Sequence, residues 1–147
     1  MVSKLRARTK ARIDAVEMFY AYSFGAYDPD EIIEKYYKYN NYKLDNKQRD
    51  FAKKLFLQTC KNSETIDKYI KKYLKKNWTI DRIGYVELSI LRVAISEFLY
   101  FDTPFFAILD EYVSIASTYT DSQVTNFVNA LLDNFKNEYR VTDGREG

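Results

Sequence analysis

The N-terminal segment carries a positive charge at every second position from residue 4 to residue 12 and contains no acidic residue. The cations are Lys4, Arg6, Arg8, Lys10 and Arg12. Lysine and arginine neutralise phosphates, and a guanidinium group can also stack on an unpaired base. Arginine-rich segments often become ordered only when they meet RNA. The pattern therefore indicates either an RNA-binding arm or a solvated, disordered terminus.

The apolar residues that follow favour the RNA-binding arm. Ile13, Val16 and Tyr20 recur at the three- and four-residue steps of an amphipathic helix, and Gly25 is a natural stop for it. Arg12 falls on this helix, which would hold its side chain in place. An arm that runs directly into a helix is better placed to bind RNA than a free terminus.

The charges of the chain are unevenly divided, although the net charge of all 147 residues is only +2. Residues 1–76 contain 18 Lys and Arg against 10 Asp and Glu, a balance of +8; residues 77–147 contain 5 against 11, a balance of −6. This asymmetry indicates a polyanionic partner for the first half and a different partner for the second. The alternative is a chance distribution of charge over solvated helix faces.

Side chains that usually carry out catalysis are scarce. The chain has no histidine, which removes the commonest base near neutral pH and the commonest metal ligand. It also has no glycine-rich phosphate loop. The acidic pairs Asp30–Glu31 and Asp110–Glu111 fall at helix starts or on helices, where carboxylates are usually caps or solvated charges. We therefore expect no enzymatic activity, no metal and no cofactor.

Cysteine usage and hydropathy point to a cytoplasmic protein. Cys60 is the single cysteine, so it cannot form an internal disulfide, and no histidine is present to activate it. No apolar run reaches the length of about 18 residues that a membrane span needs. The basic N-terminus is not followed by the apolar core of a signal peptide.

Two surface features each leave two readings open. Lysines in the fourth predicted helix and just after it form either a solvated face or an extension of a cationic RNA track. They are Lys68, Lys71, Lys72, Lys75 and Lys76. Four tyrosines cannot all face inward, so one or two are exposed for a protein interface or for base stacking. They are Tyr36, Tyr37, Tyr39 and Tyr42.

The chain is predicted to be all-α, with about seven helices in one domain over residues 1–147. It contains only four glycines and two prolines, and no long stretch alternates with a period of two. After the first helix, start signals lie at Asp28, Asp45, Ser63, Thr79 or Asp81, and Ser122, and Pro104 lies beyond the end of the fifth helix. We expect helical subdomains at about 1–76 and 77–139, and a flexible tail at 140–147.

Several motifs, in a specific order and spacing, resemble those of the NusB family. Asn77–Ala94 is similar to the family's W-x-x-x-R-I … E-x-x-I-L-R-x-A segment. The other matching segments are Arg12–Tyr20 (R-x-x-A-x-x-A-L-Y), Glu97–Pro104 (E-L-x-Y … P), Leu109–Glu111 (I-N-E) and Phe127–Asp133 (F-V-N-G-V-L-D). The resemblance covers roughly residues 8–136. Asp110 replaces the usual asparagine, and Ala130 replaces the usual glycine.

The resemblance implies two packed helical bundles without enzymatic activity. It also implies a partner, the ribosomal protein known as NusE. Together the two proteins would bind the single-stranded boxA element of nascent transcripts, especially ribosomal RNA leaders. The complex would load other Nus factors onto RNA polymerase. The resemblance leaves open whether the chain forms a homodimer.

The resemblance also assigns roles to individual residues. The family's arginine-rich arm falls on Arg8, Lys10 and Arg12. Its RNA-facing phenylalanine falls on Phe127, and the acidic residue that normally lies four positions earlier is replaced by Gln123. Its NusE-facing side falls on Tyr20 and Glu87. Phe127 has an alternative role as a buried core residue beside Leu131.

A second hypothesis is a protein-interaction scaffold that binds RNA only non-specifically. Such a protein would bind the NusE-like partner while its affinity for RNA stays weak and independent of sequence. The RNA-binding hypothesis predicts instead an affinity that falls with salt concentration, because bound cations replace the counterions of the phosphates.

Overall fold

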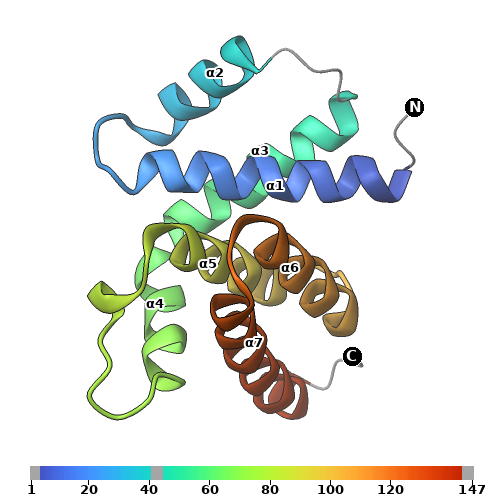
Figure 1. Cartoon of the computed structure of the whole chain (residues 1–147). Helices are drawn as coiled ribbons and strands as arrows, with labels where there is room; N and C mark the ends of the chain where they lie inside the picture. The colour runs from blue at the N-terminus through green and yellow to red at the C-terminus, as the bar shows by residue number, and fades with distance from the viewer. Residues whose placement is uncertain (1–3, 41–44, 144–147) are drawn as a thin grey trace.

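The computed structural model describes residues 4–40 and 45–143, with side chains described for residues 7–40 and 45–139. Over these residues the chain forms seven α-helices and one short 3-10 helix, with no β-strand (Figure 1). The elements are α1 (Lys4–Tyr22), α2 (Pro29–Tyr39), α3 (Asn46–Lys61), α4 (Ser63–Lys72), η1 (Ile80–Arg82), α5 (Tyr85–Tyr100), α6 (Phe105–Tyr119) and α7 (Ser122–Asp143). The all-α prediction is confirmed. No helix in the described part of the chain is long and apolar enough to cross a membrane.

Local capping signals define the starts of α2 and α3 as predicted. The Asp28 carboxylate accepts a hydrogen bond from the backbone N–H of Glu31 at 3.0 Å, and Pro29 occupies the first helical position. The Asp45 carboxylate accepts one from the N–H of Gln48 at 2.8 Å. Each bond satisfies a donor that the helix itself cannot pair.

Two predicted caps were displaced by one residue. Ser63 is the first residue of α4 and follows the cap residue Asn62, whose side chain makes no capping bond. Ser122 is likewise the first residue of α7, and the carboxylate of Asp121 accepts the hydrogen bond from the N–H of Val124 at 2.8 Å. Aspartate and serine are comparable caps, so the sequence did not distinguish the two neighbours.

The predicted start of the fifth helix at Thr79 or Asp81 was wrong. That signal belongs to the single turn of η1, and α5 begins at Tyr85 after the cap residue Gly84. Between them, Ile83 is buried and has an extended backbone, with φ −85° and ψ 135°. Anchoring Ile83 in the core takes the chain out of helical geometry at this point.

Both ends of the chain are more helical than expected. The cationic arm is part of α1, which begins at Lys4 rather than near Arg12. At the other end α7 continues to Asp143, so residues 140–143 are helical where a flexible tail was predicted. Residues 144–147 of that predicted tail lie outside the described residues.

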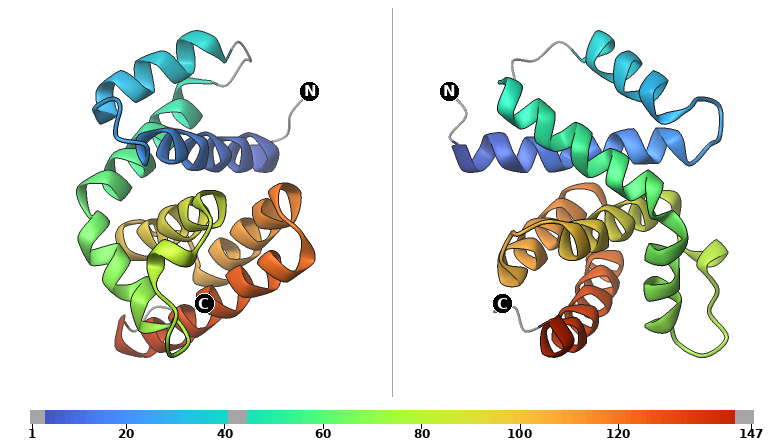
Figure 2. Two further views of the ribbon diagram at one scale, coloured as in Figure 1. Left: turned by 60° about the vertical axis from the view of Figure 1, so that its left-hand side comes forward. Right: turned by 180° about the vertical axis from the view of Figure 1, so that it is seen from behind.

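The helices form two groups that meet along α5. Helices α1, α2 and α3 form one group, and α4, α5, α6 and α7 form the other (Figures 1 and 2). Helix α5 packs against α1, α3, α4, α6 and α7, and its middle is buried on all sides. The predicted division near residue 77 falls in the loop after α4, and α4 packs against α5 and η1.

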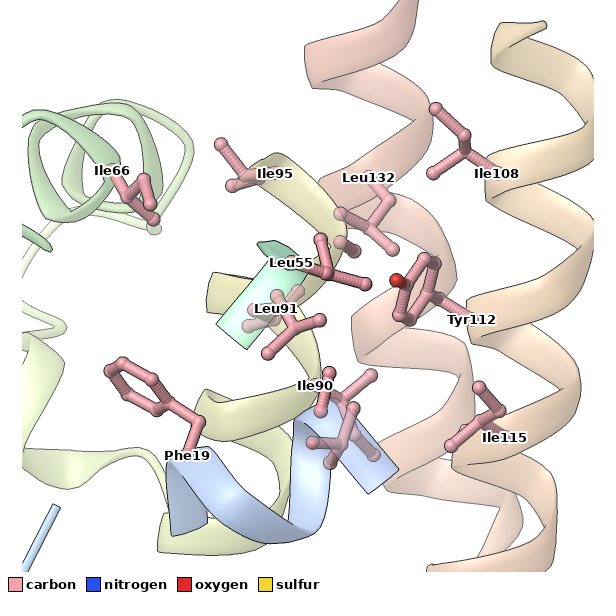
Figure 3. Close-up of a cluster of buried hydrophobic side chains, with 14 of the residues drawn as sticks. Phe19, Leu55, Ile66, Ile90, Leu91, Ile95, Ile108, Tyr112, Ile115 and Leu132 are labelled. Carbon is pink, nitrogen blue, oxygen red and sulfur yellow. The ribbon is translucent and has the colours of Figure 1, made fainter. Parts of the chain in front are cut away.

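A single hydrophobic core joins the two groups. Figure 3 shows Leu55 from α3 and Leu91 from α5 between Phe19 of α1 and side chains of α6 and α7 such as Tyr112 and Leu132. All of these side chains are buried, and Tyr112 of α6 points its hydroxyl group into the same cluster. Fully burying one such side chain contributes about 1.5–3 kcal/mol. The arrangement of α1 relative to α5 and α6 is therefore held by the core and not by a flexible linker.

Candidate nucleic-acid and protein interfaces

The helical conformation of the arm redistributes its cations. Residues four apart share a face of an α-helix, so Lys4, Arg8 and Arg12 lie on one side of α1 and Arg6 and Lys10 on another. The alternating sequence thus does not give a single cationic edge. The side chains of Lys4 and Arg6 lie outside the described residues.

Arg12, which was predicted to belong to the RNA-binding arm, is buried, and its guanidinium group pairs with two carboxylates. Its Nε and Nη2 atoms donate to the two carboxylate oxygens of Glu97 at 2.8 and 2.7 Å, and Nη1 donates to Glu111 at 2.7 Å. Only 6 % of Arg12 is exposed. Burial alone would lower the pKa of Arg12, but the hydrogen bonds and charge of Glu97 outweigh it and raise that pKa above its usual value. Arg12 is a structural cation between α1, α5 and α6.

The remaining described cations of the arm have different surroundings. The Arg8 guanidinium lies over the ring of Phe51, 3.9 Å from its centroid. Burial lowers the pKa of Arg8, as does the nearby charge of Arg12. Lys10 forms an ion pair with the buried carboxylate of Asp14 at 3.5 Å. Arg8 is therefore the better candidate for contact with an anionic partner.

Phe127 and Gln123 line a surface groove of about 450 Å³ between α7, the start of α5 and the segment that links α4 to η1. Phe127 is half-buried, with part of its ring against the core and part in the groove. Gln123 is exposed one helical turn earlier. Trp78, 49 % exposed, and Arg82 line the same groove. An indole, a phenyl ring and a cation around one hollow could accommodate a planar, negatively charged ligand such as a nucleotide.

Glu87 lies in this groove and not beside Tyr20, with which the sequence grouped it. Its carboxylate folds back toward the start of α5. A Cβ atom placed on Gly84 would lie 2.6 Å from Glu87 Oε1, so the glycine leaves the space that the carboxylate occupies. An acidic side chain in the first turn also interacts favourably with the helix dipole.

Tyr20 belongs to a second, apolar hollow between α1, α5 and α6. The hollow, of about 200 Å³, is lined by Val16, Glu17, Tyr20, Val86, Ser89 and Tyr119. Next to it, the Tyr20 ring lies 5.1 Å from that of Phe24, which lies 4.9 Å from that of Tyr85. All three rings are more than one-third exposed. We call Tyr20, Phe24 and Tyr85 the aromatic patch; exposed aromatic groups of this kind are typical of protein interfaces.

Several residues of these surfaces were not predicted from the sequence. Trp78 was used only as part of a motif, although it lines the groove with Phe127. Phe24 follows Tyr20 by four residues, and this spacing could have indicated a shared face. Tyr85 and Phe51 could not have been found, because their partners come from other helices.

An all-helical fold with a cationic–aromatic surface, a groove lined by aromatic groups and a separate aromatic patch defines a class of small binding proteins. Comparison with known proteins gives the family. The family model described as the NusB family matches residues 9–137. A transcription antitermination protein NusB from a Nitratiruptor species is 32 % identical over 136 residues, covering 92 % of this chain and 96 % of the relative. The same protein from a Sulfurovum species is 38 % identical, covering 88 % and 97 %.

Solved structures agree with this family assignment. A crystal structure of the antitermination factors NusB and NusE in complex with dsRNA aligns with a TM-score of 0.80 at 30 % identity, covering 91 % of this chain and 98 % of that one. The solution structure of NusB from Aquifex aeolicus aligns with a TM-score of 0.74 at 31 % identity, covering 97 % and 95 %. The chain belongs to the NusB family of transcription antitermination proteins.

Proposed function

We propose that the chain is an antitermination factor that binds single-stranded, boxA-type RNA together with the ribosomal protein NusE, and so supports processive transcription of ribosomal RNA operons. The observation that carries the proposal is the presence of two kinds of surface on one rigid fold. One combines cations with aromatic rings, at Arg8 and in the groove of Phe127. The other is the aromatic patch beside the hollow of Tyr20.

RNA would bind through Arg8, Lys10 and the groove, with Lys4 and Arg6 extending the cationic end of α1. Base stacking on an aromatic side chain contributes about 1–3 kcal/mol per base. Phe127 and Trp78 would supply such rings, and Gln123 would hydrogen-bond to a base or sugar. The family relative that was solved with NusE holds double-stranded RNA, so single- and double-stranded forms of one sequence should be compared directly.

NusE would bind at the aromatic patch, with Tyr20 beside the second hollow and Glu87 reached from the neighbouring groove. The second half of the chain has a net charge of −6, which suits a basic ribosomal protein. Further Nus factors and RNA polymerase would join a larger complex. The chain would act by binding alone, without enzymatic activity.

The proposal is tested by titrating boxA-like RNA against the chain with and without NusE over a range of salt concentrations. The logarithm of the affinity should fall with the logarithm of the salt concentration by about 0.7 for each neutralised phosphate. Phe127→Leu, which keeps an apolar side chain against the core, should weaken RNA binding and leave NusE binding unchanged. Absence of RNA binding in the presence of NusE would refute the proposal.

A second candidate function is a protein scaffold that contacts RNA only non-specifically. It is favoured by the burial of Arg12, which removes one cation from the arm, and by the exposed rings of Phe24 and Tyr85. A scrambled RNA of equal length separates the two functions. Equal affinity for the scrambled and boxA-like sequences would support the scaffold.

A further inference from the structure

The second hollow has apolar walls and one charged side chain, Glu17 of α1. Its other lining residues are Val16, Tyr20, Val86, Ser89 and Tyr119. Glu17 is half-buried, and the rings of Tyr20 and Tyr119 are more than one-third exposed, so a partner can enter the hollow from solvent. The Ser89 hydroxyl group donates to the backbone oxygen of Tyr85 at 2.7 Å. Glu17 is therefore the side chain of this hollow that can recognise a partner by charge.

Two tyrosines from other helices hold the Glu17 carboxylate. The hydroxyl group of Tyr36, on α2, lies 2.5 Å from Glu17 Oε1, and that of Tyr119, at the end of α6, donates to Glu17 Oε2 at 3.2 Å. Tyr36 also lies 2.9 Å from Asp14, which has its own hydrogen bond from Tyr37 at 3.0 Å. A hydroxyl group has a single proton, and the shorter distance assigns that of Tyr36 to Glu17. Both oxygens of the Glu17 carboxylate are thus oriented.

The charge of Glu17 is not neutralised by any residue that the structure describes. Its carboxylate forms no ion pair with a described lysine or arginine. Asp14, a second acid, lies three residues earlier on the same helix. Burial raises the pKa of Tyr119, and the charges of Glu17 and Asp14 raise it further, as expected in a negatively charged environment. Tyrosine hydroxyl groups orient the carboxylate and leave its charge for a partner.

These features select a cationic side chain as the occupant of the hollow. The unpaired carboxylate would repel the phosphates of a nucleic acid. A lysine or arginine side chain suits both parts of the hollow, because its apolar stem can lie along the walls while its charged end reaches the carboxylate. The tyrosine rings at the rim also attract a cation.

We propose that the second hollow is a socket for one lysine or arginine side chain of a protein partner, with Glu17 as its counter-charge. The inference rests on the proposed binding of NusE and extends it, because Tyr20 belongs to both the hollow and the aromatic patch. A basic ribosomal protein supplies such side chains. Tyr36 and Tyr119 are positioning residues, since a carboxylate fixed in advance loses less entropy when the partner binds.

The experiment measures NusE binding by calorimetry for wild type, Glu17→Gln and Glu34→Gln. Loss of the counter-charge in Glu17→Gln should weaken binding about tenfold and make it less sensitive to salt. Glu34 is an exposed glutamate of α2 that does not line the hollow, so Glu34→Gln removes the same charge and should leave both properties unchanged. Binding of boxA-like RNA in the absence of NusE should be the same for all three proteins.

Variants of NusE identify the side chain that enters the socket. Each exposed lysine and arginine of NusE is replaced by methionine and tested against wild type and Glu17→Gln. One replacement should weaken binding to wild type and have little effect on binding to Glu17→Gln, because the two groups contact each other. Independent effects at every position would mean that no cation of NusE pairs with Glu17.

Tyr36→Phe and Tyr119→Phe test the positioning of the carboxylate. Each variant removes one hydroxyl group and keeps both the ring and the charge of Glu17. Each should weaken NusE binding less than Glu17→Gln does, with the salt dependence of wild type. Lower stability in urea with unchanged affinity would make the hydroxyl groups purely structural and overturn their positioning role. Circular dichroism should show the same helix content for all variants.

Two results would overturn the socket while the proposed function stands. One is wild-type NusE binding by Glu17→Gln when Phe24→Ser, which alters the aromatic patch outside the hollow, binds NusE weakly. The other is a change in the self-association of Glu17→Gln in sedimentation experiments with unaltered NusE binding, which would make a second copy of this chain the occupant. If wild type does not bind NusE at all, both the socket and the proposed NusE complex are refuted.

Discussion

Arg12 of α1 and Glu97 of α5, 85 positions apart in the chain, form a buried two-point ion pair with N···O distances of 2.8 and 2.7 Å. The Glu97 carboxylate also accepts hydrogen bonds from Tyr112 at 2.7 Å and from Thr103 at 2.8 Å. This buried carboxylate is tolerated because hydrogen bonds from Arg12, Tyr112 and Thr103 occupy its lone pairs. This network links the helix that carries the cationic arm to α5 and α6.

Removal of Arg12 should destabilise the protein strongly. Arg12→Ala leaves Glu97 buried without its counter-charge, which costs about 3–5 kcal/mol. Arg12→Lys keeps the charge but cannot make two parallel bonds, so its loss should be smaller. Urea unfolding measures both, with Lys68→Ala on the exposed face of α4 as a control that changes stability by no more than about 0.5 kcal/mol. If Arg12→Ala is as stable as wild type but binds RNA more weakly, Arg12 contacts RNA and is not a structural cation.

Stability should fall at alkaline pH through Tyr112. Burial first, and then the charge of Glu97, raise the pKa of Tyr112 well above its ordinary value of 10.0. The unfolded tyrosine therefore releases its proton near pH 10 while the folded one keeps it, and stability is lost as the pH rises above that value. Tyr112→Phe should be less stable near neutral pH, by about 1 kcal/mol for the lost hydrogen bond.

The same variant should lose less stability between neutral pH and pH values above 10 than wild type does. Unfolding midpoints recorded across this range would measure the difference. Tyr73 provides a comparison with the fully buried Tyr112. Its pKa is also raised, but it is half-buried and its hydroxyl group donates a hydrogen bond to Glu138 at the surface. If wild type and Tyr112→Phe lose the same stability at alkaline pH, the loss does not come from Tyr112.

Cys60 should react slowly with alkylating reagents while the protein is folded. Burial raises the pKa of its thiol from 9.0 to about 12, so the reactive thiolate is rare at mildly alkaline pH. Mass spectrometry after iodoacetamide treatment should show little labelling in native protein and rapid labelling in urea. Equal rates in both conditions would show that the thiol is accessible and ionised in the fold.

Gly84→Ala should move the Glu87 carboxylate with little effect on folding. The backbone at residue 84, with φ −63° and ψ 152°, suits alanine, but the new Cβ would lie 2.6 Å from Glu87 Oε1. The flexible carboxylate can swing away. If Glu87 contacts NusE, Gly84→Ala and Glu87→Gln should weaken that binding by similar factors in calorimetric titrations. If Glu87→Gln weakens NusE binding and Gly84→Ala does not, the Glu87 carboxylate still reaches NusE in the Gly84→Ala variant.

Sequence by itself determined the helices whose start and stop signals are local. The carboxylates of Asp28 and Asp45 cap helices by bonding to an N–H three residues later, and such contacts can be inferred from spacing alone. The family motifs and the uneven division of charge were also readable without a structure. Where a distant contact overrides the local signal, as at the buried Ile83, the predicted helix start was wrong.

Only the tertiary structure decided what the candidate site residues do. Arg8 and Arg12 have the same chemistry and lie one helical turn apart, yet Arg8 lies on Phe51, whereas Arg12 pairs with the buried Glu97 and the partly exposed Glu111. The difference comes from α3, which places the Phe51 ring closer to Arg8 than to Arg12, and from α5 and α6, which place carboxylates beside Arg12. Phe127 is likewise half core and half groove because α7 packs against α5 and α6 and also lines the groove. Burial and charge pairing depend on neighbours that are remote in sequence, so residue spacing cannot specify them.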